Sequence, residues 1–135
     1  MKIDLLHQYA GDMGLEVMVD DLGPHRRGAY LDDHRLILIS PRLTVAQTVA
    51  TLAHEIGHAA FRDRRTSERL EQRADQMGAS LAIEAEEYAL AESRVGCHPG
   101  ALASELGVTP RLVLAWRTWW ETKGVVSHGL GREAA

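Results

Sequence analysis

The residues of this chain with the clearest chemistry are His54, Glu55 and His58, which follow the spacing H-E-x-x-H. Two histidines four residues apart lie on one face of an α-helix, so both imidazole rings can reach a single metal ion. The glutamate between them lies beside that ion and can accept a proton from a metal-activated water. The spacing therefore predicts a catalytic Zn2+ site with His54 and His58 as ligands and Glu55 as the general base.

One amphipathic helix, expected over residues 44–61, must position these side chains. Thr44 and Gln47 form a capping-box start just after Pro41. Helical periodicity places both histidines opposite an apolar stripe, which consists of Val45, Val49, Leu52, Ile56 and Ala60. The ordinary alternative is a pair of surface histidines that flank a helical glutamate, so the choice depends on a third ligand.

A catalytic zinc commonly takes three protein ligands and leaves one position for water. Glu68, Glu71 and Asp75 share one face of a second long helix, expected over residues 67–93, and any of them could reach the ion. We favour Glu71, because Asp75 can then accept the free N–H of a zinc-bound histidine. Taken alone, the same acids would be a solvated helix face. The two helices can approach closely because small residues face each other: Ala53, Gly57, Ala74 and Gly78.

The remaining pattern predicts an α+β fold. A helix is expected over residues 3–13, and strands over 15–20, 28–31 and 35–40. Residues 32–34 join the last two strands. We expect a small twisted three-stranded sheet of antiparallel type, packed on the H-E-x-x-H helix and the second long helix.

These motifs resemble those of the ImmA/IrrE-type zinc metallopeptidases, in which H-E-x-x-H is followed by E-x-x-A-D, here at residues 71–75. The similarity covers roughly residues 1–90 and implies zinc bound by His54, His58 and Glu71, with Glu55 as the base. The Glu-then-Asp spacing also looks like the gluzincin class, where the Asp supports a histidine ligand. The chain departs from the family pattern at residues 76–83, which lack the usual aromatic run and proline-containing ending.

Such proteins typically cleave, and so inactivate, a helix-turn-helix repressor. The resemblance thus implies a zinc-dependent endopeptidase whose partner is a repressor of this kind and whose activity derepresses phage, mobile-element or stress genes. The rival interpretation is a non-proteolytic module that binds a repressor or DNA and has a structural or vestigial metal site. A third is an enzyme held latent until a partner or signal releases it.

A second pattern occupies residues 99–120. Ala103, Gly107 and Val113 have the spacing of a helix-turn-helix, and Thr109-Pro110 is a typical helix start. Further apolar positions supply its core: Leu102, Leu106, Val108 and Trp116. The second helix offers Arg111 and Arg117 to phosphates, but residues 99–135 carry a net charge of only +1. We therefore favour packing or partner docking over DNA binding.

The domain organisation follows from these patterns. We expect a zinc metallopeptidase-like domain at residues 1–95, a helix-turn-helix-like helical unit at 96–124 and a loose tail at 125–135. A transition-state donor would complete the site, and Tyr30, His34 and His98 are candidates that no spacing distinguishes. Residues 28–31 are our choice for an edge strand that binds an extended peptide.

Composition narrows the class of partner and the compartment. The net charge of −4 provides no general attraction for nucleic acid. The sequence has no apolar run of about 18 residues, so we expect no contact with a membrane. A single cysteine, Cys97, and an N-terminus without a signal-peptide pattern predict a cytoplasmic protein.

Overall fold

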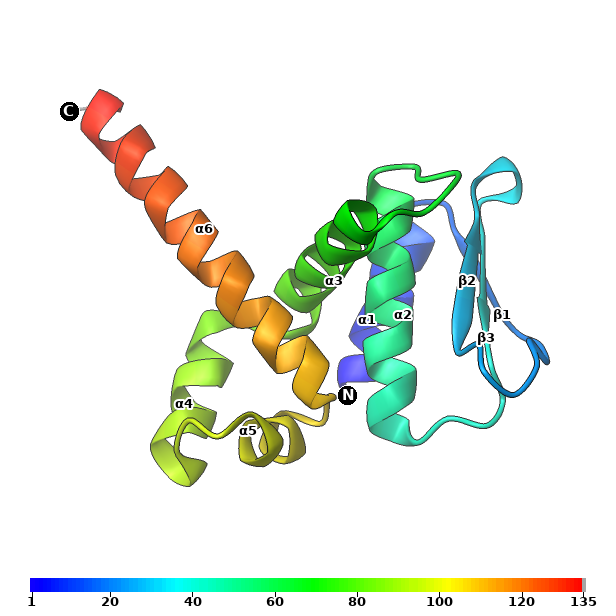
Figure 1. Cartoon of the computed structure of the whole chain (residues 1–135), viewed down its shortest axis with the longest axis horizontal. Coiled ribbons are helices and arrows are strands. Elements are labelled where there is room, and N and C mark those ends of the chain that lie inside the picture. Colours follow the sequence, from blue (N-terminus) through cyan, green and yellow to red (C-terminus); the bar gives the residue numbers. More distant parts are fainter. Residues whose placement is uncertain (135) are drawn as a thin grey trace.

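Helices build most of the molecule, and a small sheet covers one side of the central helix α2 (Figure 1). The structure, a computed structural model, describes the backbone of residues 1–134 and the side chains of residues 1–123. In chain order the elements are α1 (Lys2–Asp12), β1 (Glu16–Val19), β2 (Gly28–Leu31), the 3₁₀ turn η1 (Asp32–His34), β3 (Leu36–Ile39), α2 (Val45–Ala60), α3 (Glu68–Ala82), α4 (Ala85–Val95), α5 (Pro99–Leu106) and α6 (Pro110–Ala134). The predicted α+β class is confirmed. No helix among the described residues is long and apolar enough to cross a membrane.

The predicted start of α2, the H-E-x-x-H helix, is confirmed. Thr44 Oγ1 accepts the N–H of Gln47 at 3.1 Å, and Gln47 Oε1 accepts the N–H of Thr44 at 3.0 Å, which completes the capping box. The predicted apolar stripe is wrong at its two ends, since Val45 is 78% exposed and Ala60 is also exposed. Helix α2 packs against β2 and β3 as well as α1 and α3, so its middle is buried on several faces and its ends are not.

The sheet is mixed, with the strand order β1-β3-β2. Strand β2 pairs with β3 in antiparallel register, as expected for two strands joined by residues 32–34, whereas β1 pairs with β3 in parallel register. The expected antiparallel type is therefore wrong for the β1–β3 pair. The apolar run of β3 takes the central place, so the loop at residues 20–27 carries the chain from one edge of the sheet to the other. Strand β2 is an edge strand, as expected.

The second long helix is interrupted. One helix was expected over residues 67–93, but α3 ends at Ala82 and α4 begins at Ala85, with Ile83 in an extended conformation between them. The indole N–H of Trp116 donates to the carbonyl of buried Ile83 at 2.9 Å. In a continuous helix, the carbonyl of Ile83 would accept a backbone N–H from the following turn. Here it accepts the indole N–H from α6 instead.

Helices α5 and α6 lie beside α3 and α4, and their apolar residues join the same core as those of α1–α3. Gly107 ends α5 in the left-handed conformation, with φ of 70°, and Ala103 and Val113 are buried as predicted. The division into residues 1–95, 96–124 and 125–135 stays a prediction. The side chains of the last segment lie outside the described residues.

The backbones of α2 and α3 touch at two glycines. A Cβ atom at Gly57 would overlap the backbone of Ala74, and one at Gly78 would overlap the backbone of Ala53. The two contacts bring the helix faces that carry the predicted ligands directly against each other. Glycine is required here because of this contact and not because of its own dihedral angles.

Replacement of Gly78 by alanine should therefore destabilise the fold. Overlap with the Ala53 carbonyl should lower the free energy of unfolding by about 1–3 kcal/mol, although alanine is the better helix former by about 1 kcal/mol. Urea denaturation measures the change. Gly11→Ala in α1 is the control, because nothing lies within 4 Å of its added Cβ, and it should be neutral or stabilising. Equal effects at the two positions would contradict the close contact.

Candidate functional site

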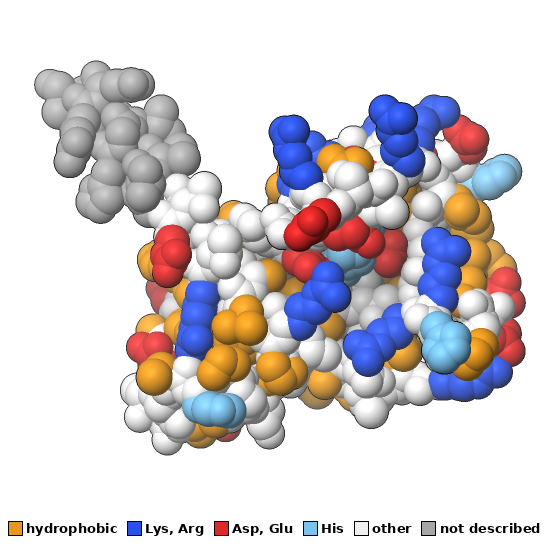
Figure 2. Space-filling model, in the orientation of Figure 1, with side chains coloured by type: hydrophobic (Ala, Val, Ile, Leu, Met, Phe, Trp, Pro, Cys, Tyr) orange, Lys and Arg blue, Asp and Glu red, His pale blue; other side chains and the backbone are white. Residues whose placement is uncertain are grey.

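A cavity of about 1000 Å³ lies between β2, α2, the α2–α3 loop, α3 and the first turn of α6. Figure 2 shows acidic and histidine side chains gathered in a hollow of this face, with Lys or Arg side chains around it. The cavity lining contains the predicted metal ligands His54, His58 and Glu71, the predicted base Glu55, and Asp75. All five come from α2 and α3, the two helices that touch at glycines.

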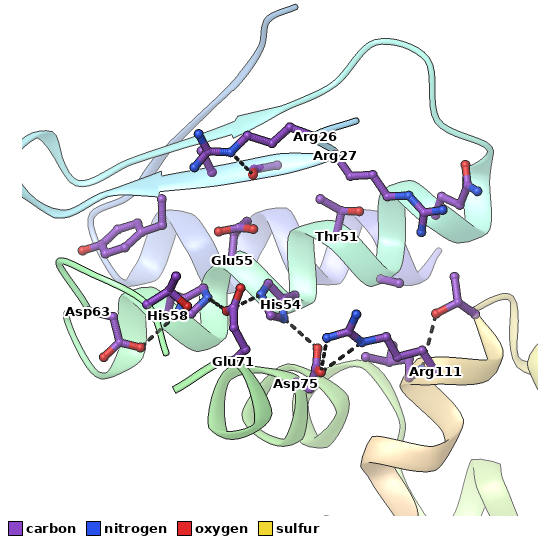
Figure 3. Close-up of a pocket in the computed structure, with 18 of the residues that line it drawn as sticks. Arg26, Arg27, Thr51, His54, Glu55, His58, Asp63, Glu71, Asp75 and Arg111 are labelled. Atoms are coloured by element: carbon purple, nitrogen blue, oxygen red, sulfur yellow. Dashed lines mark hydrogen bonds and ion pairs between the residues drawn. The ribbon is translucent and has the colours of Figure 1, made fainter. Parts of the chain in front are cut away.

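Three ligand atoms converge at the floor of this cavity. His54 and His58 project from successive turns of α2, and Glu71 faces them from α3 (Figure 3). Their ligand atoms all lie within 4.8 Å of one another. Oε2 of Glu71 is 3.2 Å from Nε2 of His54 and also contacts Nε2 of His58. Glu68, the other acid considered on this helix face, is exposed and does not line the cavity.

A carboxylate holds each histidine from behind. Nδ1 of His54 lies 2.7 Å from Oδ1 of Asp75, and Nδ1 of His58 lies 2.9 Å from Oδ2 of Asp63. An ionised carboxylate can only accept, so each Nδ1 carries the hydrogen and donates it. In the neutral form of such a ring, the Nε2 atom is then left with a lone pair that faces the other ligand atoms.

This arrangement fits a metal cation. Two Nε2 lone pairs and a carboxylate oxygen lie within 4.8 Å of one another, and three acceptors at such separations repel one another unless a cation lies between them. Two imidazole nitrogens with one carboxylate oxygen also form a donor set that Zn2+ takes in catalytic sites. His54, His58 and Glu71 are therefore the residues that could hold the metal.

Asp63 is a site residue that the sequence reasoning missed. It belongs to the loop after α2, yet its side chain is only 7% exposed. Its backbone N–H also donates to the carbonyl of His58 at 3.0 Å, so the loop folds back over the end of α2. The sequence did offer one indication of such a residue. Asp75 was expected to accept the N–H of one histidine ligand, and the second histidine had no carboxylate partner.

An arginine binds the far oxygen of each of these carboxylates. Arg111 donates from Nε and Nη2 to Oδ2 of Asp75, at 3.1 and 2.8 Å, and Arg73 donates from Nη2 to Oδ1 of Asp63 at 2.6 Å. Arg111 lies in the first turn of α6, so the C-terminal helices contribute a contact to the site. Arg117 is also used within the chain, since its guanidinium donates to the hydroxyl of Tyr88. The two arginines considered for phosphate contact are thus both paired internally.

The charges of the site perturb one another. Burial raises the pKa of Glu55, although the rings of His54 and His58 act in the opposite direction. Burial would lower the pKa of His54, but the hydrogen bond to Asp75 and the nearby carboxylates raise it overall. Burial would raise the pKa of Asp75, but its bonds to His54 and Arg111 lower it overall. Asp75, the carboxylate behind His54, is thus stabilised in its charged form, whereas Glu55 is a carboxylate with raised proton affinity.

Glu55 lies against the edge strand. Its carboxylate would be only 3.2 Å from a Cβ atom at Gly28, and such an atom would also overlap the methyl group of Thr51. The start of β2 therefore touches α2 directly, and no larger residue fits at this point. Glu55 is placed between the ligand set and the strand along which a peptide could lie (Figure 3).

The three residues considered as transition-state donors are not brought together. Tyr30 lines the cavity, but its hydroxyl donates to Asp32 and accepts from Arg35 at 2.6 Å. His34 is exposed in η1, and His98 caps α5 by accepting the N–H of Gly100, so neither ring lines the cavity. Spacing alone could not place the rings of His34 and His98, because each lies in a short segment between longer elements, and the direction of such a segment depends on tertiary packing.

Comparison with known families agrees with this geometry. The sequence profile of Peptidase_M78, described as the IrrE N-terminal-like domain, matches residues 10–115. The match covers well over half of the chain. The chain belongs to this family. A search of curated proteins found no match.

The IrrE N-terminal-like family is the one that the sequence motifs resemble, so that prediction is confirmed. It is a family of metallopeptidases, and metal dependence is typical of it. The matched residues include the whole ligand set and also Arg111 in α6. The part of the chain shared with the family therefore extends beyond the H-E-x-x-H helix and into the C-terminal helices.

Asp63→Asn should weaken metal binding. Loss of the negative charge behind His58 makes its ring a poorer ligand, and changes of this kind typically lower metal affinity about 10- to 100-fold. Competition with a chromophoric chelator measures the zinc affinity. Asp33→Asn is the matched control, because Asp33 is exposed and lies outside the cavity lining. Equal affinities of the two variants would show that Asp63 does not support the site.

Proposed function

We propose that the protein is a zinc-dependent endopeptidase. In this proposal His54, His58 and Glu71 bind Zn2+, Glu55 is the general base, and Asp75 and Asp63 fix the two histidine rings. The single observation that carries the proposal is the convergence of three ligand atoms beside a buried glutamate, in a chain of a metallopeptidase family. A bound Zn2+ supplies a Lewis acid, which polarises a peptide carbonyl and acidifies a water molecule.

Glu55 moves the proton. Its carboxylate takes a proton from the water that attacks the carbonyl carbon, and it later delivers this proton to the nitrogen of the leaving amine. The low exposure of Glu55, 7%, excludes bulk water from the transfer and favours retention of the proton between the two steps. With the metal bound, the neighbouring histidines would not compete for the proton, because their Nε2 lone pairs would be used as ligands while Asp75 and Asp63 hold their Nδ1 hydrogens.

Strand β2 offers a place for the substrate. Within the described sheet it pairs with β3 on one side only, and residues 28–30 line the cavity. An extended peptide could add to this edge through main-chain hydrogen bonds, which would align its carbonyl groups above the ligand set. Because the contact of Gly28 with α2 is tight, the added strand would pass directly by Glu55.

We further propose that the substrate is a helix-turn-helix repressor, and that its cleavage derepresses the genes it controls. Support for this partner comes from the family resemblance. The rival interpretation, a module that binds DNA, loses support because Arg111 and Arg117 are paired within the chain.

Glu55→Gln is the direct test of the mechanism. The amide cannot accept the proton, so cleavage of the cognate repressor should fall by about 10²- to 10⁴-fold, whereas the zinc content should stay the same. Mass spectrometry of repressors encoded near the gene measures cleavage, and elemental analysis measures zinc. Glu68→Gln makes the same chemical change at an exposed position and should retain full activity.

Two results would contradict the proposal. Cleavage by Glu55→Gln at the full rate would remove Glu55 from the mechanism. Tight binding of a repressor by the zinc-loaded protein, with no cleavage in the presence of either zinc or a chelator, would favour the non-proteolytic module instead.

A further inference from the structure

The cavity is surrounded by positive charge, although the chain as a whole is negative. Of its 15 Lys and Arg residues, five line this one cavity, and the net charge of the chain is −4. The five are Arg26, Arg27, Arg64, Arg65 and Arg111. Figure 2 shows the blue side chains on several sides of the hollow that holds the acidic groups. This distribution concentrates attraction for anions at the mouth of the candidate site.

Two of these arginines are already neutralised within the chain. Arg64 pairs with Asp32 and Asp33, and Arg111 pairs with Asp75. The other three, Arg26, Arg27 and Arg65, form no ion pair with any carboxylate among residues 1–123, whose side chains the structure describes. All three are exposed. Their charges are therefore available to a bound molecule.

The three available arginines lie on both sides of the ligand set. Arg26 and Arg27 immediately precede β2, and Arg65 lies in the loop after α2. Strand β2 and helix α2 start at the same end of the molecule, so these two loops lie at opposite ends of the cavity (Figure 1). In Figure 3 the side chain of Arg27 extends toward the end that holds Arg111, and that of Arg26 toward the end that holds His58. A strand added along β2 would pass these positive charges before and after the metal ligands.

We propose that this site selects an acidic peptide segment, with Asp or Glu side chains on both sides of the bond that is cleaved. Arg27 would bind a carboxylate at one end of the cavity, and Arg65 would bind one at the other. The proposal rests on the proposed peptidase function and adds the chemical class of its substrate. Exposed arginines form ion pairs of modest strength, so several charges must act together to give a preference.

The floor of the cavity favours a peptide over a nucleic acid. Four acids line it, and Asp63 and Asp75 are paired with Arg73 and Arg111, so Glu55 and Glu71 supply the negative charge beneath the positive margin. A nucleic acid has a phosphate at every residue and would bring some of them over these carboxylates. A peptide can place its acidic side chains at the margin and a neutral backbone over the floor.

The test compares two pools of fluorescein-labelled dodecapeptides with randomised central residues. One pool has Glu at the flanking positions on both sides, and the other has Gln. Binding to zinc-loaded Glu55→Gln is followed by fluorescence anisotropy, and cleavage by zinc-loaded wild type is followed by mass spectrometry. The Glu pool should bind and be cleaved at least about fivefold better, and the difference should shrink as ionic strength rises.

Charge reversal identifies the arginines responsible. Arg27→Glu and Arg65→Glu should each reduce the preference for the Glu pool about fivefold, and Arg27→Lys should retain most of it. Arg69→Glu is the matched control, because Arg69 is exposed on α3 but does not line the cavity. Circular dichroism and zinc content show that each variant is folded and loaded. A preference that Arg69→Glu reduces as strongly as Arg27→Glu would reflect overall charge and overturn the proposal.

The outcomes separate this inference from the peptidase function. Cleavage of both pools at equal rates would overturn the acidic preference and leave the peptidase function intact. Preferential binding of the Glu pool without cleavage of either pool would support the acidic site and overturn the peptidase function. Tighter binding of a single-stranded oligonucleotide of equal charge than of the Glu pool would overturn the assignment to a peptide.

Discussion

The contact between the backbones of α2 and α3 is the constraint on which the site depends. It occurs where Gly57 meets Ala74 and where Gly78 meets Ala53. Three of these four residues are chain neighbours of residues in the site, because Ala53 precedes His54, Gly57 precedes His58, and Ala74 precedes Asp75. The packing that excludes a side chain at each glycine therefore also sets the separation of the ligands. A wider spacing of the helices would move Glu71 away from both histidines.

Around this contact the charges alternate from the centre outward. The ligand atoms at the centre are acceptors, Asp75 and Asp63 hold the histidines, and Arg111 and Arg73 neutralise those carboxylates. Buried carboxylates are costly without compensation, and each of these has a hydrogen-bond donor on both oxygens. The pairing is completed by residues distant in sequence, since Arg111 lies 36 positions after Asp75. The site thus draws on α2, the following loop, α3 and α6.

Local patterns predicted the parts of the structure that depend on local interactions. The capping box of Thr44, the spacing of His54 and His58 and the helix face of Glu71 are set by residues a few positions apart. The break at Ile83 could not be predicted, because no proline or glycine causes it and the stabilising contact comes from Trp116. The parallel direction of β1 depends likewise on where a loop crosses the sheet, which side-chain alternation does not encode. Asp63 was missed because its burial results from the fold of a loop.

The bond between Arg111 and Asp75, together with that between Trp116 and Ile83, has a thermodynamic consequence. The first bond joins α6 to α3, the helix that carries Glu71, and the second joins α6 to Ile83, the residue that follows α3. The apolar residues of α3 and α6 belong to one core. Unfolding of the C-terminal helices therefore removes supports of the ligand set, and the two regions should lose structure cooperatively. A cation bound only by native His54, His58 and Glu71 consequently stabilises residues as remote in sequence as Trp116, through mass action on the whole folded state.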